Sequence, residues 1–281
     1  MAFRNAVGVQ PPFSLVRCGG TEVAVARRGS GQPVICLHAT GHGGRDFEDF
    51  AAELSGQGFE LICVDWPGHG SSPSDLPGQS ASARRYVNLL EDLVPELCGD
   101  VRPILLGNSI GGAAALSFAC RHPDRVRALI LCNPGGLAPL DRSAKAAIAM
   151  MVRFFDAGAR DAWWFGRAFA LYYRLVLPGK SALAQRGRIV AAGREMAVVL
   201  REAWDSFRAP EADLRDAAQS LQVPLLCAWA KSDKIVAWGA SKVAVQAIPG
   251  AVVEFFRGGH APFLEDQTAF NAAFLKFARG V

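Results

Sequence analysis

The chain has 281 residues, of which 51% are hydrophobic and 20% are charged, and its formal net charge is +4. This composition is typical of a globular protein, and the length suffices for one large core with an inserted subdomain. The charge is too small and too dispersed to favour nucleic-acid binding. No apolar run approaches the roughly 20 residues that a membrane span requires, and residues 1–12 contain no continuous hydrophobic segment of the kind found in a secretory signal.

Seven cysteines occur, and none of them form a CxxC pair, so the sequence gives little support to a zinc or redox site. Four of them fall within predicted buried strands: Cys36, Cys63, Cys132 and Cys227. This placement favours reduced thiols that act as small core residues. We therefore expect a cytoplasmic protein.

The predicted elements alternate between strands and helices along the chain. Strands are expected at residues 14–17, 21–26, 34–38, 61–64, 103–106, 128–132, 223–228 and 252–256, and helices at 45–55, 82–98, 111–122 and 266–278. The central strands are continuous apolar runs, as parallel strands covered on both faces should be. The first two flank Gly19-Gly20 and predict an antiparallel hairpin at one edge. The pattern indicates an α/β fold with a mostly parallel sheet of about eight strands and helices on both faces.

Ser109 lies between Gly107 and Gly111, directly after a strand pattern and before a helix pattern. The chain must reverse sharply there, which places the serine in a strained backbone conformation and requires glycine on either side. Such a turn points the hydroxyl into a cleft, with the Ile110 amide and the helix N-terminus aimed at the same place. The same five-residue pattern also occurs in ordinary turns, so a nucleophilic role depends on a base and an acid elsewhere in the chain.

His260 is the best candidate for the base, because it follows a strand-like run over residues 251–256 and two glycines. Loops at the carboxyl ends of strands carry the catalytic groups of α/β folds. The alternative is a turn histidine packed under the final helix. Of the other histidines, His69 and His122 lie in turns and are expected to be structural.

Asp233 is the best candidate for the acid, because it follows the apolar strand pattern over residues 223–228. From there its carboxylate could reach a histidine on the next strand's loop. The alternative is a solvated aspartate beside Lys231 and Lys234. Asp141 and Asp205 are weaker candidates, since neither follows a strand at comparable spacing.

Several motifs together resemble the α/β-hydrolase fold superfamily over nearly the full length. Besides the Gly-Asn-Ser-Ile-Gly turn, these are the strand and His-Ala-Thr-Gly loop over residues 34–41, the Asp-Trp-Pro-Gly-His-Gly-Ser-Ser turn over 65–72 and the Phe-Leu-Glu-Asp run over 263–266. The order Ser109, Asp233, His260 is the order that this architecture imposes. The resemblance implies a serine hydrolase with that triad and without a cofactor.

The resemblance also assigns the oxyanion hole to the backbone amides of Thr40 and Ile110. The family usually has glycine after the loop histidine, where this chain has Ala39, so the approach of the backbone to the substrate could differ slightly. The spacing of His38 and His42 could suggest a metal site, but the stretch is a glycine-rich loop rather than a helix. No metal is expected, and His42 is a candidate for lining the cleft.

Residues 137–220 contain no clear strand and many aromatic residues, and this segment resembles the family's helical cap. We expect residues 1–136 and 221–281 to form the core domain, with the cap covering the serine site. Most cap aromatics are expected to build the cap's own core, and a few to face Ser109. The candidate substrate contacts are His42, Trp66, Phe154, Trp163, Trp164 and Tyr172.

The predicted function is hydrolysis of carboxylic esters of small to medium hydrophobic substrates through an acyl-enzyme, by a monomer or a homodimer. Serine at the turn argues against haloalkane dehalogenases and epoxide hydrolases, which have aspartate there, and haloperoxidases of this scaffold usually have methionine where this chain has Ile110. Carbon–carbon hydrolases of ring-cleavage products share Gly-Asn-Ser-x-Gly-Gly but differ at Ala39-Thr40-Gly41 and Ala261, which puts that alternative second. A slow-turnover ligand sensor on the same scaffold is a further alternative.

Overall fold

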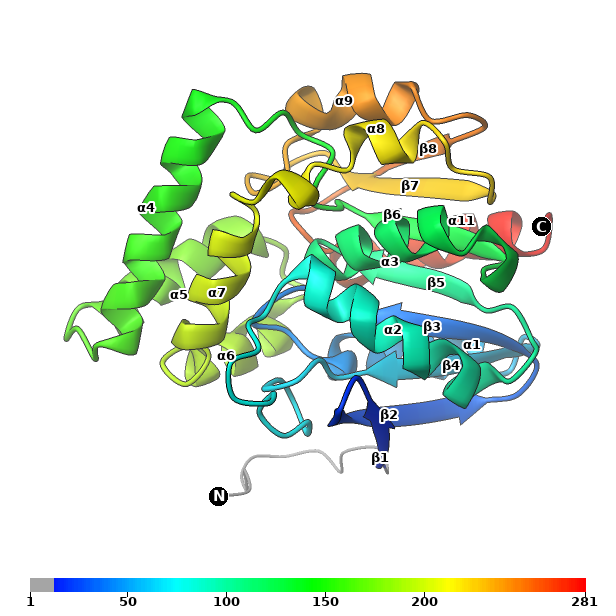
Figure 1. Cartoon of the computed structure of the whole chain (residues 1–281), viewed down its shortest axis with the longest axis horizontal. Coiled ribbons are helices and arrows are strands. Elements are labelled where there is room, and N and C mark those ends of the chain that lie inside the picture. The colour runs from blue at the N-terminus through cyan, green and yellow to red at the C-terminus, as the bar shows by residue number, and fades with distance from the viewer. Residues whose placement is uncertain (1–12) are drawn as a thin grey trace.

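The computed structural model describes residues 13–281. Within them, eight strands form one sheet in the order β1-β2-β4-β3-β5-β6-β7-β8 (Figure 1). The strands are β1 (Phe13–Cys18), β2 (Thr21–Gly29), β3 (Gln32–Leu37), β4 (Phe59–Val64), β5 (Ile104–Asn108), β6 (Ala128–Cys132), β7 (Leu225–Ala230) and β8 (Val252–Phe256). The β1–β2 and β2–β4 pairs are antiparallel, and every other pair is parallel. The predicted α/β fold is confirmed, as is the hairpin at the edge.

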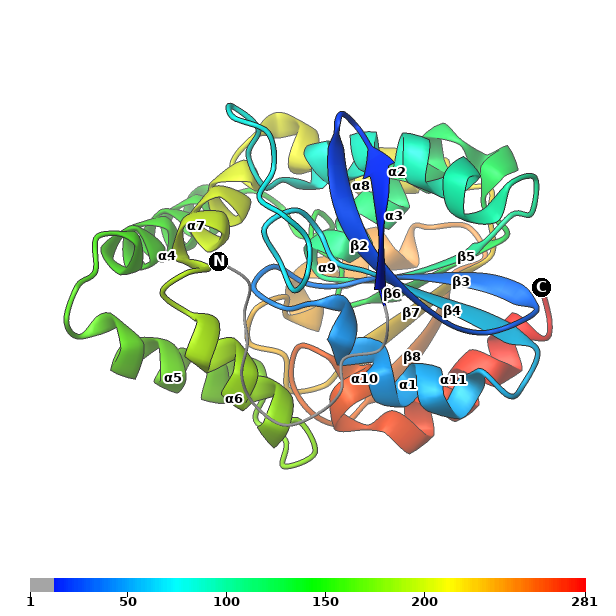
Figure 2. The same cartoon turned by 90° about the horizontal axis from the view of Figure 1, so that it is seen from below.

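Helices cover both faces of the sheet. They are α1 (Glu48–Leu54), α2 (Ala83–Cys98), α3 (Ile110–Arg121), α4 (Arg142–Ala159), α5 (Phe165–Val176), α6 (Leu183–Ala192), α7 (Ala197–Ser206), α8 (Arg215–Ala218), α9 (Trp238–Gln246), α10 (Pro262–Glu265) and α11 (Gln267–Ala278), with short 3-10 turns η1 (Gly44–Phe47), η2 (Pro123–Arg125) and η3 (Pro210–Ala212). One apolar layer joins the sheet to α2, α3, α8 and α9, and the other joins it to α1, α10 and α11 (Figure 2). Because β5, β6 and β7 are buried along their whole length, their apolar runs are continuous rather than alternating.

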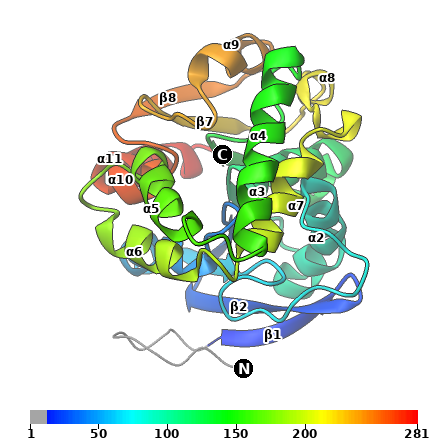
Figure 3. The same ribbon diagram turned by 90° about the vertical axis from the view of Figure 1, so that its left-hand side faces the viewer.

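Helices α4 to α7 form an insertion between β6 and β7 that lies beyond one end of the sheet (Figures 1 and 3). Its own core is aromatic, and Phe155, Phe165 and Phe169 are fully buried within it. The short helix α8 also falls within residues 137–220, but it packs on α3 and places Ala218 in the core beneath the sheet. We therefore describe α4 to α7 as the insertion and α8 as part of the main layer.

The insertion sits over the carboxyl ends of the parallel strands. At Gly41, after β3, a side chain would come within 3.0 Å of Leu200 and 3.1 Å of the Tyr173 hydroxyl. At Gly135, after β6, it would meet the Phe207 ring at 2.6 Å. The loops at this edge are therefore enclosed between the sheet and the insertion. Among residues 13–281, no helix combines the length and the apolar character needed to cross a bilayer.

Candidate active site

Ser109 occupies the sharp turn between β5 and α3, with φ 55° and ψ −115°. A positive φ is uncommon outside glycine and costs free energy, so the surrounding structure must hold it in place. A side chain at Gly107 would approach the Gly111 carbonyl oxygen to 2.6 Å, and one at Gly111 would approach the Leu37 carbonyl oxygen to 2.4 Å. The predicted sharp reversal, with glycine required on both sides of the serine, is confirmed. The serine itself stays partly exposed.

Two backbone N–H groups, one at this turn and one on the loop after β3, are available to a ligand. Ile110 is the first residue of α3, so its N–H has no acceptor within the helix. In the described part of the chain, the Thr40 N–H donates to no protein atom either. The close approach of Gly111 to the carbonyls of Leu37 and His38 places the loop that carries Thr40 against the start of α3.

Two buried histidines hold this loop. The Nδ1–H of His38 donates to the Ala39 carbonyl at 2.7 Å, which leaves its Nε2 to accept the Trp66 N–H at 3.0 Å. In the same way, Nε2 of His69 accepts the Gly41 N–H at 3.1 Å. Burial lowers the pKa of His38 well below its usual value and lowers that of His69 to about 4. Both rings are therefore neutral at pH 7 and serve as structural acceptors, and a structural role was predicted for His69.

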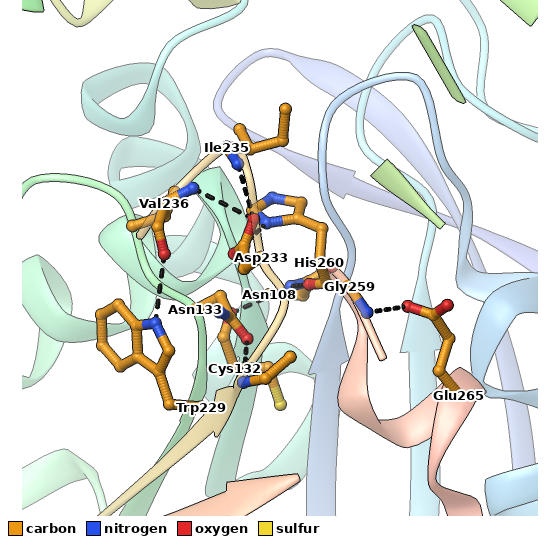
Figure 4. Close-up of polar contacts among 11 residues, drawn as sticks. Asn108, Cys132, Asn133, Trp229, Asp233, Ile235, Val236, Gly259, His260 and Glu265 are labelled. Carbon is orange, nitrogen blue, oxygen red and sulfur yellow. Dashed lines mark hydrogen bonds and ion pairs between the residues drawn. The ribbon is translucent and has the colours of Figure 1, made fainter. Parts of the chain in front are cut away.

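His260 and Asp233 form a buried hydrogen-bonded pair (Figure 4). The distance from His260 Nδ1 to Asp233 Oδ2 is 2.8 Å, and the two residues are 4% and 6% exposed. The other carboxylate oxygen, Oδ1, accepts the N–H groups of Ile235 at 2.7 Å and Val236 at 3.2 Å. These two bonds orient the carboxylate, and the carboxylate keeps the proton on Nδ1 of the ring. Nε2 of His260 is thereby free to accept a proton.

The other aspartates considered from the sequence lie elsewhere. Asp141 caps the N-terminus of α4, where its carboxylate accepts the Ala144 N–H at 2.8 Å. Asp205 is exposed on α7 and pairs with Arg208 at 2.9 Å. Both therefore have local structural roles.

The sequence did not predict that Asn108 would connect the serine turn to the His260 loop. Its fully buried Nδ2 donates to the carbonyl of His260 at 2.9 Å and to that of Cys132 at 2.9 Å (Figure 4). The residue that precedes the serine thus holds the main chain of the histidine. The only signal in the sequence was the position of Asn108 next to Ser109.

Glu265 is a second residue whose role the sequence left open. Its carboxylate accepts the N–H of Gly259 at 2.6 Å and the N–H of Gly179, in the insertion, at 2.5 Å. The N–H of His260 also donates to the insertion, to the Val176 carbonyl at 2.8 Å. Burial raises the pKa of Glu265, and its two amide bonds offset part of that shift. The insertion therefore bonds directly to the histidine loop at Val176 and indirectly through Glu265, whose carboxylate accepts an N–H group from each side.

Three of the six candidate substrate contacts form one aromatic group in the insertion. Phe154 lies 6.1 Å from the Trp164 ring and 6.0 Å from the Tyr172 ring, measured between centroids. The pKa of Tyr172 is raised by burial and then by the negative charge of Asp233, so its hydroxyl lies within electrostatic reach of the His260–Asp233 pair. Tyr172 therefore links this aromatic group to the His260–Asp233 pair.

The other three candidates are placed differently. Trp66 is fully buried in the core, stacked on Tyr86 at 4.2 Å, and its indole N–H donates to the His38 carbonyl at 3.1 Å. Trp163 is 83% exposed on the outside of the insertion. His42 is buried beside Tyr173 at the inner end of the insertion, and its Nδ1 is bonded to an Asp46 carboxylate oxygen at 2.5 Å. We therefore leave Trp66 and Trp163 out of the candidate site and keep His42.

A sequence model of the alpha/beta hydrolase fold matches residues 32–267 of this chain. The chain belongs to the α/β-hydrolase fold family. The match spans the serine turn, Asp233 and His260, so the predicted class of enzyme, a hydrolase, is confirmed at the level of the family.

Individual relatives of this α/β-hydrolase agree with the assignment. It is 30% identical over 255 residues to a pimeloyl-[acyl-carrier protein] methyl ester esterase of Chromobacterium violaceum, covering 87% of this chain and 93% of the relative. Among solved structures, it superposes on an esterase from Exiguobacterium antarcticum with a TM-score of 0.80 and 21% identity, covering 95% of this chain and 99% of the other. A thermophilic esterase from Thermogutta terrifontis gives a TM-score of 0.78 at 20% identity, covering 96% of this chain and 98% of the other.

Proposed function

We propose that this α/β-hydrolase cleaves carboxylic esters of small to medium hydrophobic substrates by way of an acyl-enzyme. Ser109 is the nucleophile, His260 the general base and Asp233 the residue that orients the imidazole. The observation that carries the proposal is the buried His260–Asp233 pair, joined through Asn108 to the turn that strains Ser109. The similarity to a relative named as a methyl ester esterase supports the ester as the bond cleaved.

In the first half of the reaction, the Ser109 hydroxyl oxygen attacks the ester carbonyl carbon while Nε2 of His260 takes the hydroxyl proton. Asp233 stabilises the resulting imidazolium. The negative charge on the former carbonyl oxygen is stabilised by the N–H groups of Thr40 and Ile110, each of which contributes on the order of 3 kcal/mol to lowering the barrier. The imidazolium of His260 then donates this proton to the ester oxygen of the alcohol group as its bond to the carbonyl carbon breaks, so that the alcohol leaves and the acyl group remains on the serine.

In the second half, His260 takes a proton from a water molecule, whose oxygen attacks the acyl carbonyl carbon. Collapse of this intermediate returns the proton to Ser109 and releases the carboxylic acid. We assign the insertion the role of a cap that limits access of bulk water, and we assign Phe154, Trp164 and Tyr172 to the surface that receives an apolar acyl or alcohol group. His42 is assigned to the same cleft.

We also propose a reducing, cytoplasmic setting for this activity. All seven cysteines are free thiols. Burial raises the pKa of Cys36 and Cys132 well above its usual value, which keeps these thiols protonated and unreactive. Such thiols suit a compartment where disulfides do not form.

The test is hydrolysis of p-nitrophenyl esters of increasing acyl length by the wild type and by Ser109→Ala. We expect repeated turnover by the wild type and a loss of kcat of at least about 10⁴-fold in the variant. Ser220→Ala is the matched control, because that exposed hydroxyl bonds to the nearby Ala217 carbonyl at 2.8 Å, and it should retain full activity. Activity that survives in Ser109→Ala contradicts the assignment. A single burst without turnover would favour a ligand sensor, and cleavage confined to ring-cleavage diketones would favour a carbon–carbon hydrolase.

A further inference from the structure

The outer side of the insertion presents apolar side chains to solvent on α5, on α6 and on the turn before α5. Leu171 is 61% exposed, Leu175 55% and Leu183 53%, and Trp163 precedes them at 83%. Helices α5 and α6 run side by side at the end of the molecule remote from the C-terminus (Figure 2). We call this surface the α5–α6 face.

The sequence of α5 divides the helix into two opposite sides. The exposed residues Arg167, Leu171, Arg174 and Leu175 recur at helical spacing and share one side. The buried residues Phe165, Phe169, Tyr173 and Val176 recur in the same way on the other. The leucines on the outer side therefore cannot turn inward without breaking the aromatic core of the insertion.

Positive charge is concentrated in the segment that carries these apolar residues. Residues 160–194 contain seven arginines and lysines and one acidic residue, a net charge of +6, whereas the whole chain carries only +4. The remainder of the chain is thus net negative. A charge distribution of this kind produces a strong local field even where the overall charge is small.

Four of these cations lack a counter-charge within the described residues. Arg160 pairs with Asp156, Arg194 with Asp161, and Arg186 donates to the Leu177 carbonyl. For Arg167, Arg174, Lys180 and Arg188, no carboxylate of residues 13–281 lies within ion-pair distance. All four are exposed.

We propose that the α5–α6 face docks this protein on an anionic lipid surface. Exposed leucines and a tryptophan among unpaired cations are the features by which a surface helix enters the headgroup region of a negatively charged bilayer. A lipid surface accepts apolar side chains at any position. A protein partner would instead have to match the shape of a surface whose apolar residues are spread over two helices and a turn.

Docking by this face has a consequence for the site beneath it. The same helix α5 carries Tyr172 on its inner side and, at its C-terminal end, the Val176 carbonyl that holds His260. The docked insertion would thus lie between the membrane and the site, where apolar molecules that partition into lipid could enter. The docking itself does not depend on the proposed ester chemistry.

The test is co-sedimentation with phosphatidylcholine vesicles that contain or lack phosphatidylglycerol. We expect binding to the anionic vesicles alone, weakened by added salt. Each cation near an anionic membrane contributes about fivefold in affinity, so a variant with all four replaced, R167Q/R174Q/K180Q/R188Q, should bind roughly 600-fold more weakly. L171S/L175S tests the apolar part and should also weaken binding. Both variants should hydrolyse soluble p-nitrophenyl esters as the wild type does.

The matched control is R102Q/R121Q/K242Q/K276Q, which removes the same charge from exposed positions outside the face. It should bind the anionic vesicles nearly as well as the wild type. Equal weakening in the two quadruple variants would overturn the proposal, because binding would then follow total charge alone. Failure of the wild type to bind the vesicles would overturn it as well, and binding to poly-L-glutamate in that case would point to an acidic protein partner.

Discussion

Replacing Asn108 by alanine tests whether the serine turn and the histidine loop are positioned by one side chain. In the folded protein its amide nitrogen donates to the carbonyls of Cys132 and His260, each at 2.9 Å, and the residue is fully buried. Alanine removes both bonds and leaves the two carbonyls in place. We therefore expect a loss of stability together with a loss of turnover.

The size of the expected loss of stability depends on which hydrogen bonds the two carbonyls keep in the variant. The Cys132 carbonyl still accepts the Ser109 N–H at 3.1 Å, so its loss is limited to the net worth of one hydrogen bond, about 1 kcal/mol. The His260 carbonyl has no second protein donor within residues 13–281, and leaving it buried and unpaired costs about 1–3 kcal/mol. The expected loss in the free energy of unfolding is about 2–4 kcal/mol, a large share of the roughly 5–15 kcal/mol of a typical domain.

Urea unfolding measures the stability, and steady-state kinetics on a p-nitrophenyl ester measure the catalytic effect. Because Asn108 positions His260 without touching substrate, kcat should fall by about tenfold or more while KM changes little. Asn271→Ala is the matched control. It truncates an equally buried asparagine whose amide atoms have no partner among the described residues, so it should cost less than about 1 kcal/mol and leave kcat unchanged. Equal destabilisation by the two variants, or a full kcat in Asn108→Ala, would refute the positioning role.

Three further predictions concern other parts of the site. Gly111→Ala should destabilise the protein by more than about 3 kcal/mol in urea unfolding, because the new methyl group would lie 2.4 Å from the Leu37 carbonyl oxygen. The control is Gly187→Ala, on an exposed helical position with no atom within 4 Å, which should be neutral or stabilising by up to about 1 kcal/mol. Similar effects of the two substitutions would contradict the steric argument. The pKa of His69 is lowered from 6.5 to about 4 in the folded protein, so the unfolded chain takes up a proton at a higher pH than the folded one. The free energy of unfolding should therefore fall by about 3 kcal/mol as the pH falls from 6.5 to 4. The urea midpoint should depend less steeply on pH in His69→Gln than in the wild type, and equal slopes would count against this account. Glu265→Gln exchanges one acceptor oxygen for an N–H₂ group that faces a backbone N–H, which should lower the free energy of unfolding by about 2 kcal/mol and also lower kcat. Thermal or urea unfolding measures the first effect, and an unchanged melting temperature would show that these bonds do not hold the histidine loop.

The sequence by itself determined the architecture and the serine turn. Continuous apolar runs predicted the central parallel strands, because a strand covered on both faces has no solvent side to be polar. Gly107 and Gly111 predicted a turn too tight for a side chain, and the steric conflict arises within a few residues of Ser109 and at the adjacent strand. Patterns of this kind are readable because short-range sterics and local burial decide them.

The sequence was less informative about where aromatic side chains point. Trp66 follows a strand at the edge where sites form, yet it stacks on Tyr86 of α2 in the core. Trp163 and Trp164 are neighbours in the sequence, but only Trp164 joins the aromatic group with Phe154. Which side of the insertion faces the sheet depends on how its helices pack, and no local pattern encodes that packing.

Only the tertiary structure decided what holds the histidine in place. Asn108 is 152 positions from His260 along the chain, and Glu265 contacts Gly179 across 86 positions. These contacts exist because the parallel strands end at one edge and the insertion returns over them. Hydrogen bonds between such distant groups follow from the packing of the whole sheet and insertion, whereas strands and turns follow from the conformational preferences of neighbouring residues.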